Sequence, residues 1–127
     1  MDEAGLVAMD RKAYVNLATF RRSGAAVETP VWFARAGTKL YVFTEARSGK
    51  VKRLRNDSRI RIAPCNARGK TLGEWSDGSG RRVDESSVVD AAYAALLRKY
   101  GWQMRLVNFF SRLTGRIEGR AILELEV

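Results

Sequence analysis

The sequence predicts a mainly β protein of the α+β class, in which six short antiparallel strands form a small barrel with flanking helices. Three observations favour this fold. Apolar and polar residues alternate in most segments, which is the period of a half-buried strand. One predicted helix follows the third strand and a helical pair precedes the last, an order unlike the regular alternation of a parallel sheet. The 127 residues make one domain, residues 1–127, that can bury roughly two thirds of its unfolded surface.

The first half of the chain contains four predicted strands and one helix. Alternation over residues 13–22 ends at a Ser23-Gly24 turn and resumes over residues 27–34, so a hairpin is expected. Pro30 has no N–H to donate, so its position is an edge, a bulge, or a place where the strand separates from its neighbour. The other elements of this half are a strand at 39–45, a helix at 49–56 and a strand at 59–65.

The second half contains weaker strand signals and two helical patterns. Residues 72–75 are a candidate fifth strand, and Asp77-Gly78-Ser79-Gly80 is predicted to form a tight turn. An apolar stripe at helical spacing over residues 88–100, with Ser86 and Ser87 as N-cap candidates and Gly101 after it, predicts an amphipathic helix. The last two predicted elements are a short helix at 103–113 and a strand at 116–127.

The absence of histidine excludes several kinds of chemistry. With 0 histidines, the chain cannot form Ser–His or Cys–His nucleophile pairs, and it cannot bind zinc or iron through imidazole. No metal site and no catalytic side chain are predicted. If the protein is an enzyme, a bound cofactor is expected to supply the reactivity, while the chain supplies orientation and a dry site.

The net charge limits the classes of binding partner, and the cysteine content limits the cellular compartment. The 23 Lys and Arg residues against 14 Asp and Glu give a net charge of +9, which favours a polyanionic partner: nucleic acid, an anionic membrane, or a phosphorylated or carboxylated small molecule. The single cysteine, Cys65, cannot form an internal disulfide, and the N-terminus lacks a signal-peptide layout. No apolar run approaches the roughly 18 residues of a membrane span. A cytoplasmic protein is therefore expected.

The start of the helix at 49–56 is the candidate anion site. Ser48 is expected to be its N-cap, so Lys50, Lys52 and Arg53 fall in the first turn, at the positive end of the helix dipole and with no nearby carboxylate to offset them. A bound phosphate would explain this unfavourable arrangement, because free N–H groups and Gly49 allow an anion to approach. The alternative is a solvated basic face.

Four stretches carry a resemblance to a known family. They are residues 14–24, 28–33, 44–57 and 59–70. The combination of Thr-Pro-Val-Trp with a later Ser-Gly-Lys-Val-Lys-Arg is the most specific part. The sequence resembles the split-barrel flavin-binding family of the pyridoxamine 5′-phosphate oxidase type, and within it the branch of oxidoreductases that depend on the deazaflavin F420. The C-terminal half agrees chiefly in layout.

The resemblance implies a six-stranded antiparallel split β-barrel of the FMN-binding type. It also implies a homodimer that holds F420 or FMN in a groove at each subunit interface. By this resemblance, the ring would be lined by Thr29, Pro30, Val31 and Trp32. The ribityl phosphate would be held by Thr44, Ser48, Gly49, Lys50, Lys52 and Arg53. A longer anionic tail would pass Arg68 and Lys70.

Three classes of function follow. The first is an oxidoreductase that transfers a hydride between bound F420 or FMN and a small organic substrate. The second is a basic β-barrel that binds nucleic acid, although its aromatic residues lie mainly at core positions. The third is a non-catalytic flavin-binding or heme-binding member of the same fold. F420 has a longer anionic tail than FMN, so the additional cations favour it; they are Arg55, Arg59, Arg61, Arg68 and Lys70.

Trp32 and Cys65 each have a purely structural alternative. Trp32 is expected to pack in the core or a dimer interface more often than to line a ring, and Cys65 is expected to be a small apolar filler.

An apolar surplus that one small barrel would not bury also favours a homodimer. Its members are Trp32, Trp75, Trp102, Phe109 and Phe110.

Overall fold

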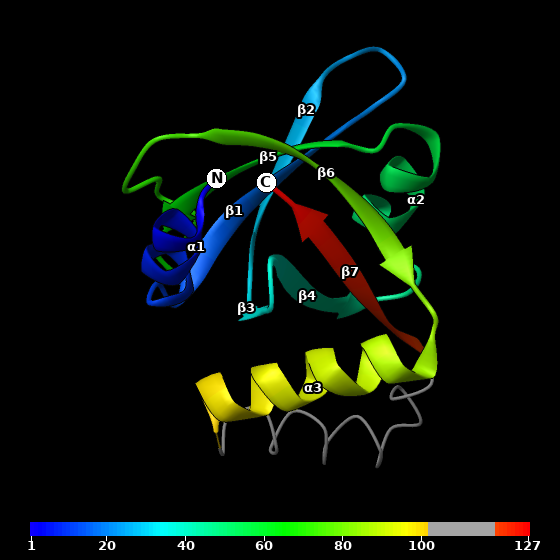
Figure 1. The fold of residues 1–127 in the computed structure, drawn as a ribbon. Helices are drawn as coiled ribbons and strands as arrows, with labels where there is room; N and C mark the ends of the chain where they lie inside the picture. The colour runs from blue at the N-terminus through cyan, green and yellow to red at the C-terminus, as the bar shows by residue number, and fades with distance from the viewer. Residues whose placement is uncertain (102–118) are drawn as a thin grey trace.

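The computed structural model describes residues 1–101 and 119–127, and within this part seven antiparallel strands form one sheet with three helices packed around it (Figure 1). The sheet order is β2-β1-β5-β6-β7-β4-β3. The strands are β1 Tyr14–Phe20, β2 Ala26–Val31, β3 Phe33–Ala36, β4 Lys39–Glu45, β5 Arg59–Cys65, β6 Ser76–Val83 and β7 Arg120–Glu126. The helices are α1 Glu3–Asp10, α2 Gly49–Asn56 and α3 Ser86–Tyr100. The predicted helix at 103–113, with Trp102, Phe109 and Phe110, lies outside the described residues.

The extra strand arises because the predicted strand at 27–34 is divided. β2 pairs with β1, with Val31 opposite Val15, whereas β3 pairs with β4, with Phe33 opposite Val42. The chain therefore passes at Trp32 from one edge strand of the sheet, β2, to the opposite edge strand, β3. Pro30 lies in β2, an edge strand of the sheet, and an edge is where a residue without an N–H is tolerated.

Strand β6 corrects two predictions. The predicted turn at residues 77–80 lies inside β6, and the candidate strand at 72–75 is not a strand. The glycines are present for close approach: a Cβ at Gly78 would collide with the carbonyl oxygen of Glu126, and one at Gly80 would lie 3.0 Å from Leu125 Cδ2. Glycine can indicate a turn or a close contact between strands, and here it permits β6 to pack tightly on β7.

Helix α1 was not expected from the sequence. It begins after Asp2, whose carboxylate accepts a hydrogen bond from the N–H of Gly5 at 2.8 Å. Only Leu6 and Met9 are buried, so the apolar pattern is too short to stand out. None of the described helices is both long and apolar enough to cross a membrane.

Two apolar clusters hold the fold together. The inner cluster fills the space enclosed by the curved sheet, and Val51 and Leu54 anchor α2 to it. The outer cluster lies between α3 and the face of β3, β4 and β7, where α3 runs along the sheet in Figure 1. Strand β7 serves both clusters through alternation, with Leu123 inside and Ile122 outside. Each fully buried Leu or Ile contributes about 1.5–3 kcal/mol.

Candidate functional site

The start of α2 is held in place by its two buried residues. Val51 and Leu54 face the core, so the helix cannot rotate about its axis without exposing them. Ser48 is the N-cap, as predicted, but its side chain makes no capping hydrogen bond. Its hydroxyl instead accepts a 3.5 Å hydrogen bond from Thr44 Oγ1 at the end of β4. The first-turn N–H groups are therefore not capped by Ser48 and can bind an anion.

Two half-buried cations crowd this helix start. The pKa of Lys50 is lowered, first by burial and then by the charge of Arg53. The pKa of Arg53 is lowered by burial and then by Arg21. Glu45 acts on Lys50 in the opposite direction, which corrects the expectation that no carboxylate is nearby. Within residues 1–101 and 119–127, however, no carboxylate forms an ion pair with Lys50 or Arg53. An anion would favour the charged form of both.

The guanidinium of Arg53 has a defined position. Its Nε donates a 2.6 Å hydrogen bond to Thr19 Oγ1, and Thr19 is fully buried in β1. Its Nη1 folds back over the helix start, where a Cβ at Gly49 would lie only 2.5 Å away. Arg53 thus covers Gly49, and a larger residue there would displace the guanidinium. Lys52, by contrast, is exposed on the helix surface.

The loop carrying Arg68 and Lys70 is also well defined. Asn66 Oδ1 accepts 3.0 Å hydrogen bonds from the backbone N–H groups of both residues. Asn16 Nδ2 donates to the carbonyl oxygen of Gly69 at 2.7 Å. Gly69 has a φ of +86°, a conformation that favours glycine, and a Cβ there would lie 3.8 Å from Pro30 Cδ. The loop therefore packs beside Pro30, and both cationic side chains are exposed.

The predicted site residues at the start of α2 and those in the loop with Arg68 and Lys70 do not come together. Asn16 contacts the Arg68 loop and Thr19 contacts Arg53, and the two positions are about 10 Å apart along β1. They also differ by an odd number of residues, so their side chains leave opposite faces of the strand. Two further tail candidates have partners of their own: Arg59 pairs with Asp57, and Arg61 pairs with Asp77.

The predicted ring-lining residues have different surroundings. Thr29 lies on β2, and its hydroxyl oxygen is buried with no hydrogen-bond partner among the described residues. Val31 is buried in the inner cluster. Trp32 is half-buried and stacks on Tyr100 of α3, with ring centroids 4.7 Å apart, so one face of its indole packs on the helix. Only Thr29 therefore presents an unsatisfied polar group.

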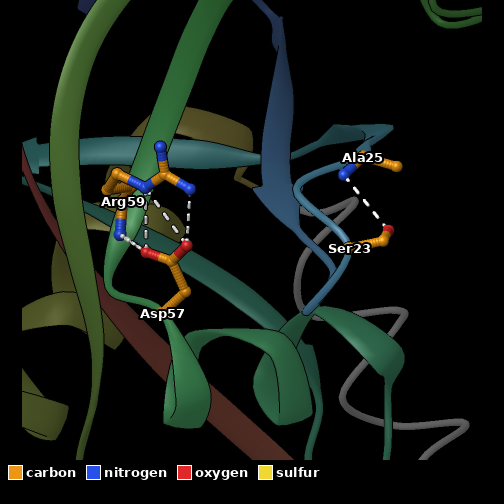
Figure 2. A network of polar contacts seen from close by, with 4 residues as sticks. All are labelled: Ser23, Ala25, Asp57 and Arg59. Carbon is orange, nitrogen blue, oxygen red and sulfur yellow. Dashed lines mark hydrogen bonds and ion pairs between the residues drawn. The ribbon is translucent and has the colours of Figure 1, made fainter.

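A pocket beside α2 was missed by the sequence analysis. It has a volume of about 320 Å³ and lies between α2 and the turn that joins β1 to β2. Figure 2 shows Ser23 and Ala25 of that turn on one side and the Asp57–Arg59 pair on the other. The lining residues are Phe20, Arg21, Arg22, Gly24, Arg53, Asn56, Asp57 and Arg59. Arg21 and Arg22 stand directly before a predicted turn, but nothing local indicates that the turn lies over α2.

The fold agrees with a known family. The model of the pyridoxamine 5′-phosphate oxidase family matches residues 3–127. The chain belongs to this family. The seven-stranded sheet with flanking helices is thus a variant of the family's split barrel, with one strand more than predicted. No curated protein sequence matches the chain.

Solved structures share the fold at low sequence identity. A conserved hypothetical protein from Mycobacterium tuberculosis has a TM-score of 0.71 and 19% identity, covering 98% of this chain and 79% of its own. The heme storage protein HutZ from Vibrio cholerae has a TM-score of 0.71 and 11% identity, covering 98% and 88%. An F420 reductase has a TM-score of 0.63 and 16% identity, covering 99% and 94%. Family members of different function therefore share this architecture.

The donors at the start of α2 suit a phosphate group. Two cations, the hydroxyl of Ser48 and the free N–H groups of a helix start meet there, and each can donate a hydrogen bond to a phosphate oxygen, while Thr44 donates to Ser48. The hydroxyl of Thr29 is buried and has no hydrogen-bond partner in the part of the chain that the structure describes. The chemistry of these donors fits the phosphate of FMN or F420.

Proposed function

We propose that this protein is an oxidoreductase that binds F420 or FMN and exchanges a hydride between the cofactor and a small organic substrate. The observation that carries this proposal is the pair of half-buried cations, Lys50 and Arg53, which lack a carboxylate partner among the described residues. Burying cations without a partner is costly, and a bound phosphate offsets that cost.

Each residue has a distinct role in this proposal. Lys50 and Arg53 hold the phosphate, and the hydroxyls of Thr44 and Ser48 with the first-turn N–H groups complete its contacts. Thr29 donates to or accepts from the ring and fixes its orientation. The bound cofactor supplies the hydride chemistry. The chain positions the ring and excludes water, so no side chain has to react covalently.

The family supports the cofactor class, and the aromatic contacts weigh against nucleic acid. An F420 reductase shares the fold over nearly the whole of both chains. Arg59 covers the ring of Phe20 at 4.7 Å, and Arg61 lies over Trp75 at 5.6 Å. Arginines therefore occupy ring faces on which the bases of a single strand would have to stack. We favour a small cofactor over a nucleic acid for this reason.

We also propose a cytoplasmic homodimer with a cofactor at each subunit interface. The resemblance to the family is the basis of this proposal. Light scattering at micromolar concentration should give twice the mass of the 14.2 kDa chain. A monomer that still binds the cofactor fully would contradict the interface site.

The test is a titration of purified protein with FMN and with F420, followed by visible absorption and calorimetry. Lys50→Ala and Arg53→Ala should each weaken binding by about 10- to 150-fold, because each removes a charge-assisted hydrogen bond to phosphate. Arg98→Ala, which removes one exposed charge on α3, is the matched control and should change little. The reduced cofactor should be oxidised by a small organic acceptor in the presence of the wild-type protein.

Three results would overturn the proposal. The first is wild-type affinity for both cofactors after Lys50 and Arg53 are replaced together. The second is a Soret band with added heme and no affinity for either flavin, which would favour the heme-binding alternative. The third is tight cofactor binding with no hydride transfer to any acceptor, which would favour a non-catalytic flavin carrier.

A further inference from the structure

The pocket between α2 and the β1–β2 turn is strongly cationic. We call it the arginine pocket, and four of its lining residues are arginines: Arg21, Arg22, Arg53 and Arg59. Its one carboxylate, Asp57, is committed to Arg59, with Oδ2 2.8 Å from Nη2 (Figure 2). Hydrogen bonds from Arg59 hold the pKa of Asp57 below its usual value, so this carboxylate stays charged.

Three positive charges remain after that pair is set aside. Arg21, Arg22 and Arg53 form no ion pair with a carboxylate in the described part of the chain. Arg21 is close enough to Arg53 to lower its pKa, so the two cations repel one another. A pocket with three uncompensated cations is suited to an anionic group.

Arg53 connects the arginine pocket to the phosphate site. Its Nη1 lies against Gly49 at the helix start, and the same side chain lines the pocket. Gly49, Arg53 and Asn56 follow one another at spacings of four and three, so they share one face of α2. The distance along this face from the helix start to Asn56 is about 10 Å at 1.5 Å per residue.

We propose that the arginine pocket binds a second anionic group of the same ligand, about 10 Å beyond the phosphate held at the start of α2. This inference rests on the proposed function and specifies its ligand: a flavin-type cofactor whose first phosphate is followed by another phosphate or by carboxylates. It places the anionic tail at Arg21 and Arg22, on the α2 side of β1, in place of the loop with Arg68 and Lys70.

The experiment compares cofactors in two pairs, each with the same ring. FMN and FAD differ only beyond the first phosphate, where FAD adds a second phosphate. F420 and its glutamate-free form differ only in the glutamate carboxylates. Calorimetry of wild type and of Arg21→Gln/Arg22→Gln gives the contribution of the pocket. The double variant should lose about 5- to 30-fold in affinity for F420 or FAD, and less than about twofold for FMN.

Two further variants make the comparison sharper. Asp57→Asn removes the one carboxylate of the pocket and releases Arg59, so it should tighten F420 or FAD about two- to fivefold while FMN is unchanged. Arg98→Gln removes the same charge from α3 and controls for net charge; it should leave all affinities as they are. A loss specific to FAD assigns the pocket to a second phosphate, and a loss specific to full-length F420 assigns it to carboxylates.

The possible failures can be told apart. If FMN binds and depends on Lys50, but Arg21→Gln/Arg22→Gln has equal effects on every cofactor, the proposed function stands and the second-anion pocket is wrong. If no flavin binds, the proposed function itself fails. If single-stranded oligonucleotides bind and the losses at Arg21 and Arg98 are equal, the arginines form a general polyanion surface, and the pocket proposal is overturned.

Discussion

Lys50 and Lys99 are both half-buried lysines whose pKa is lowered chiefly by burial, but their surroundings differ. Lys99 on α3 lies 3.4 Å from the carboxylate of Asp10 and 3.6 Å from the ring centroid of Phe33. Lys50 has another cation, Arg53, as its strongest charged neighbour. The fold supplies Lys99 with an ion pair and an aromatic ring, while its Nζ makes no hydrogen bond to the described residues. In our proposal, a ligand compensates the charge of Lys50. A buried cation therefore indicates a binding site when its partner is missing.

Around Lys99, polar groups of the end of α3 bind to other parts of the fold. The hydroxyl of Tyr100 accepts from the N–H of Phe33 at 3.0 Å and lies 2.8 Å from the carbonyl oxygen of Ala13. Asp10 also accepts from the N–H of Arg35 at 3.0 Å. The end of α3 is thus joined to α1, to the residue before β1 and to β3, and its polar groups serve the fold.

The largest effect is expected from Lys50→Glu, which should stabilise the fold and at the same time weaken cofactor binding. A carboxylate in the first turn of α2 interacts favourably with the helix dipole and with Arg53, so the free energy of unfolding should rise by about 0.5 kcal/mol. The same carboxylate repels a phosphate, so affinity for FMN and F420 should fall at least about 100-fold. Urea unfolding and calorimetry measure the two quantities. Destabilisation with intact binding would reverse our interpretation of Lys50.

Removing the ion-pair partner of Lys99 should have the opposite result: the fold should lose stability while cofactor binding is unchanged. Asp10→Asn keeps an acceptor for the N–H of Arg35 but leaves the ammonium of Lys99 without its ion pair, so the free energy of unfolding should fall by about 1–2 kcal/mol. Affinity for the cofactor should not change. A loss of affinity that exceeds the loss of stability would show that the two regions are coupled.

The difference between the regions also explains what the sequence could predict. The bounds of β4, α2 and β5 match the predictions, and α3 ends before Gly101 as predicted, because alternation, helical spacing and terminating residues are local. The N-cap of α3 is Glu85, however, and not one of the candidates Ser86 and Ser87. Strand β6 could not be predicted, since the function of Gly78 depends on Glu126, which is far away in the sequence. The division of the strand at Trp32 likewise depends on two partner strands that lie on different sides of the sheet.

The candidate site follows the same rule. Lys50 and Arg53 are three residues apart on one short helix, so their proximity was visible in the sequence. Thr19, which fixes Arg53, is 34 residues away along the chain, and Arg21 reaches α2 only because the β1–β2 turn lies over it. The separation of Arg53 from the loop with Arg68 has a related reason: the β1 side chains that contact them, Thr19 and Asn16, leave opposite faces of the strand.

A pH dependence of moderate size should distinguish the two lysines. Because the pKa of Lys50 in the folded protein is below its ordinary value of 10.5, the unfolded chain holds more protons between the two values, and the ligand-free protein should gain stability as pH rises through that window. A bound phosphate restores the charged form, so binding should take up a proton and weaken, by at most about tenfold per pH unit, as pH rises toward 10.5.

Calorimetry in buffers of different ionisation enthalpy measures this proton uptake directly. Lys50→Ala should abolish it, because the titrating group is then absent. Asp10→Asn should leave it unchanged, since the charge of Lys99 does not depend on the ligand. Proton uptake that survives Lys50→Ala would assign the effect to another group and weaken the argument from burial.

The smallest effect is expected at Lys52, which the sequence places in the same cationic turn as Lys50. The structure shows Lys52 exposed on the helix surface, whereas Lys50 is half-buried and faces Arg53. Exposed charges are screened and free to move, so Lys52→Ala should weaken cofactor binding by less than about twofold at physiological salt. The measurement is a pair of titrations at low and high ionic strength. A loss as large as that of Lys50→Ala would mean that charge density alone, rather than a missing internal partner, determines where the phosphate binds.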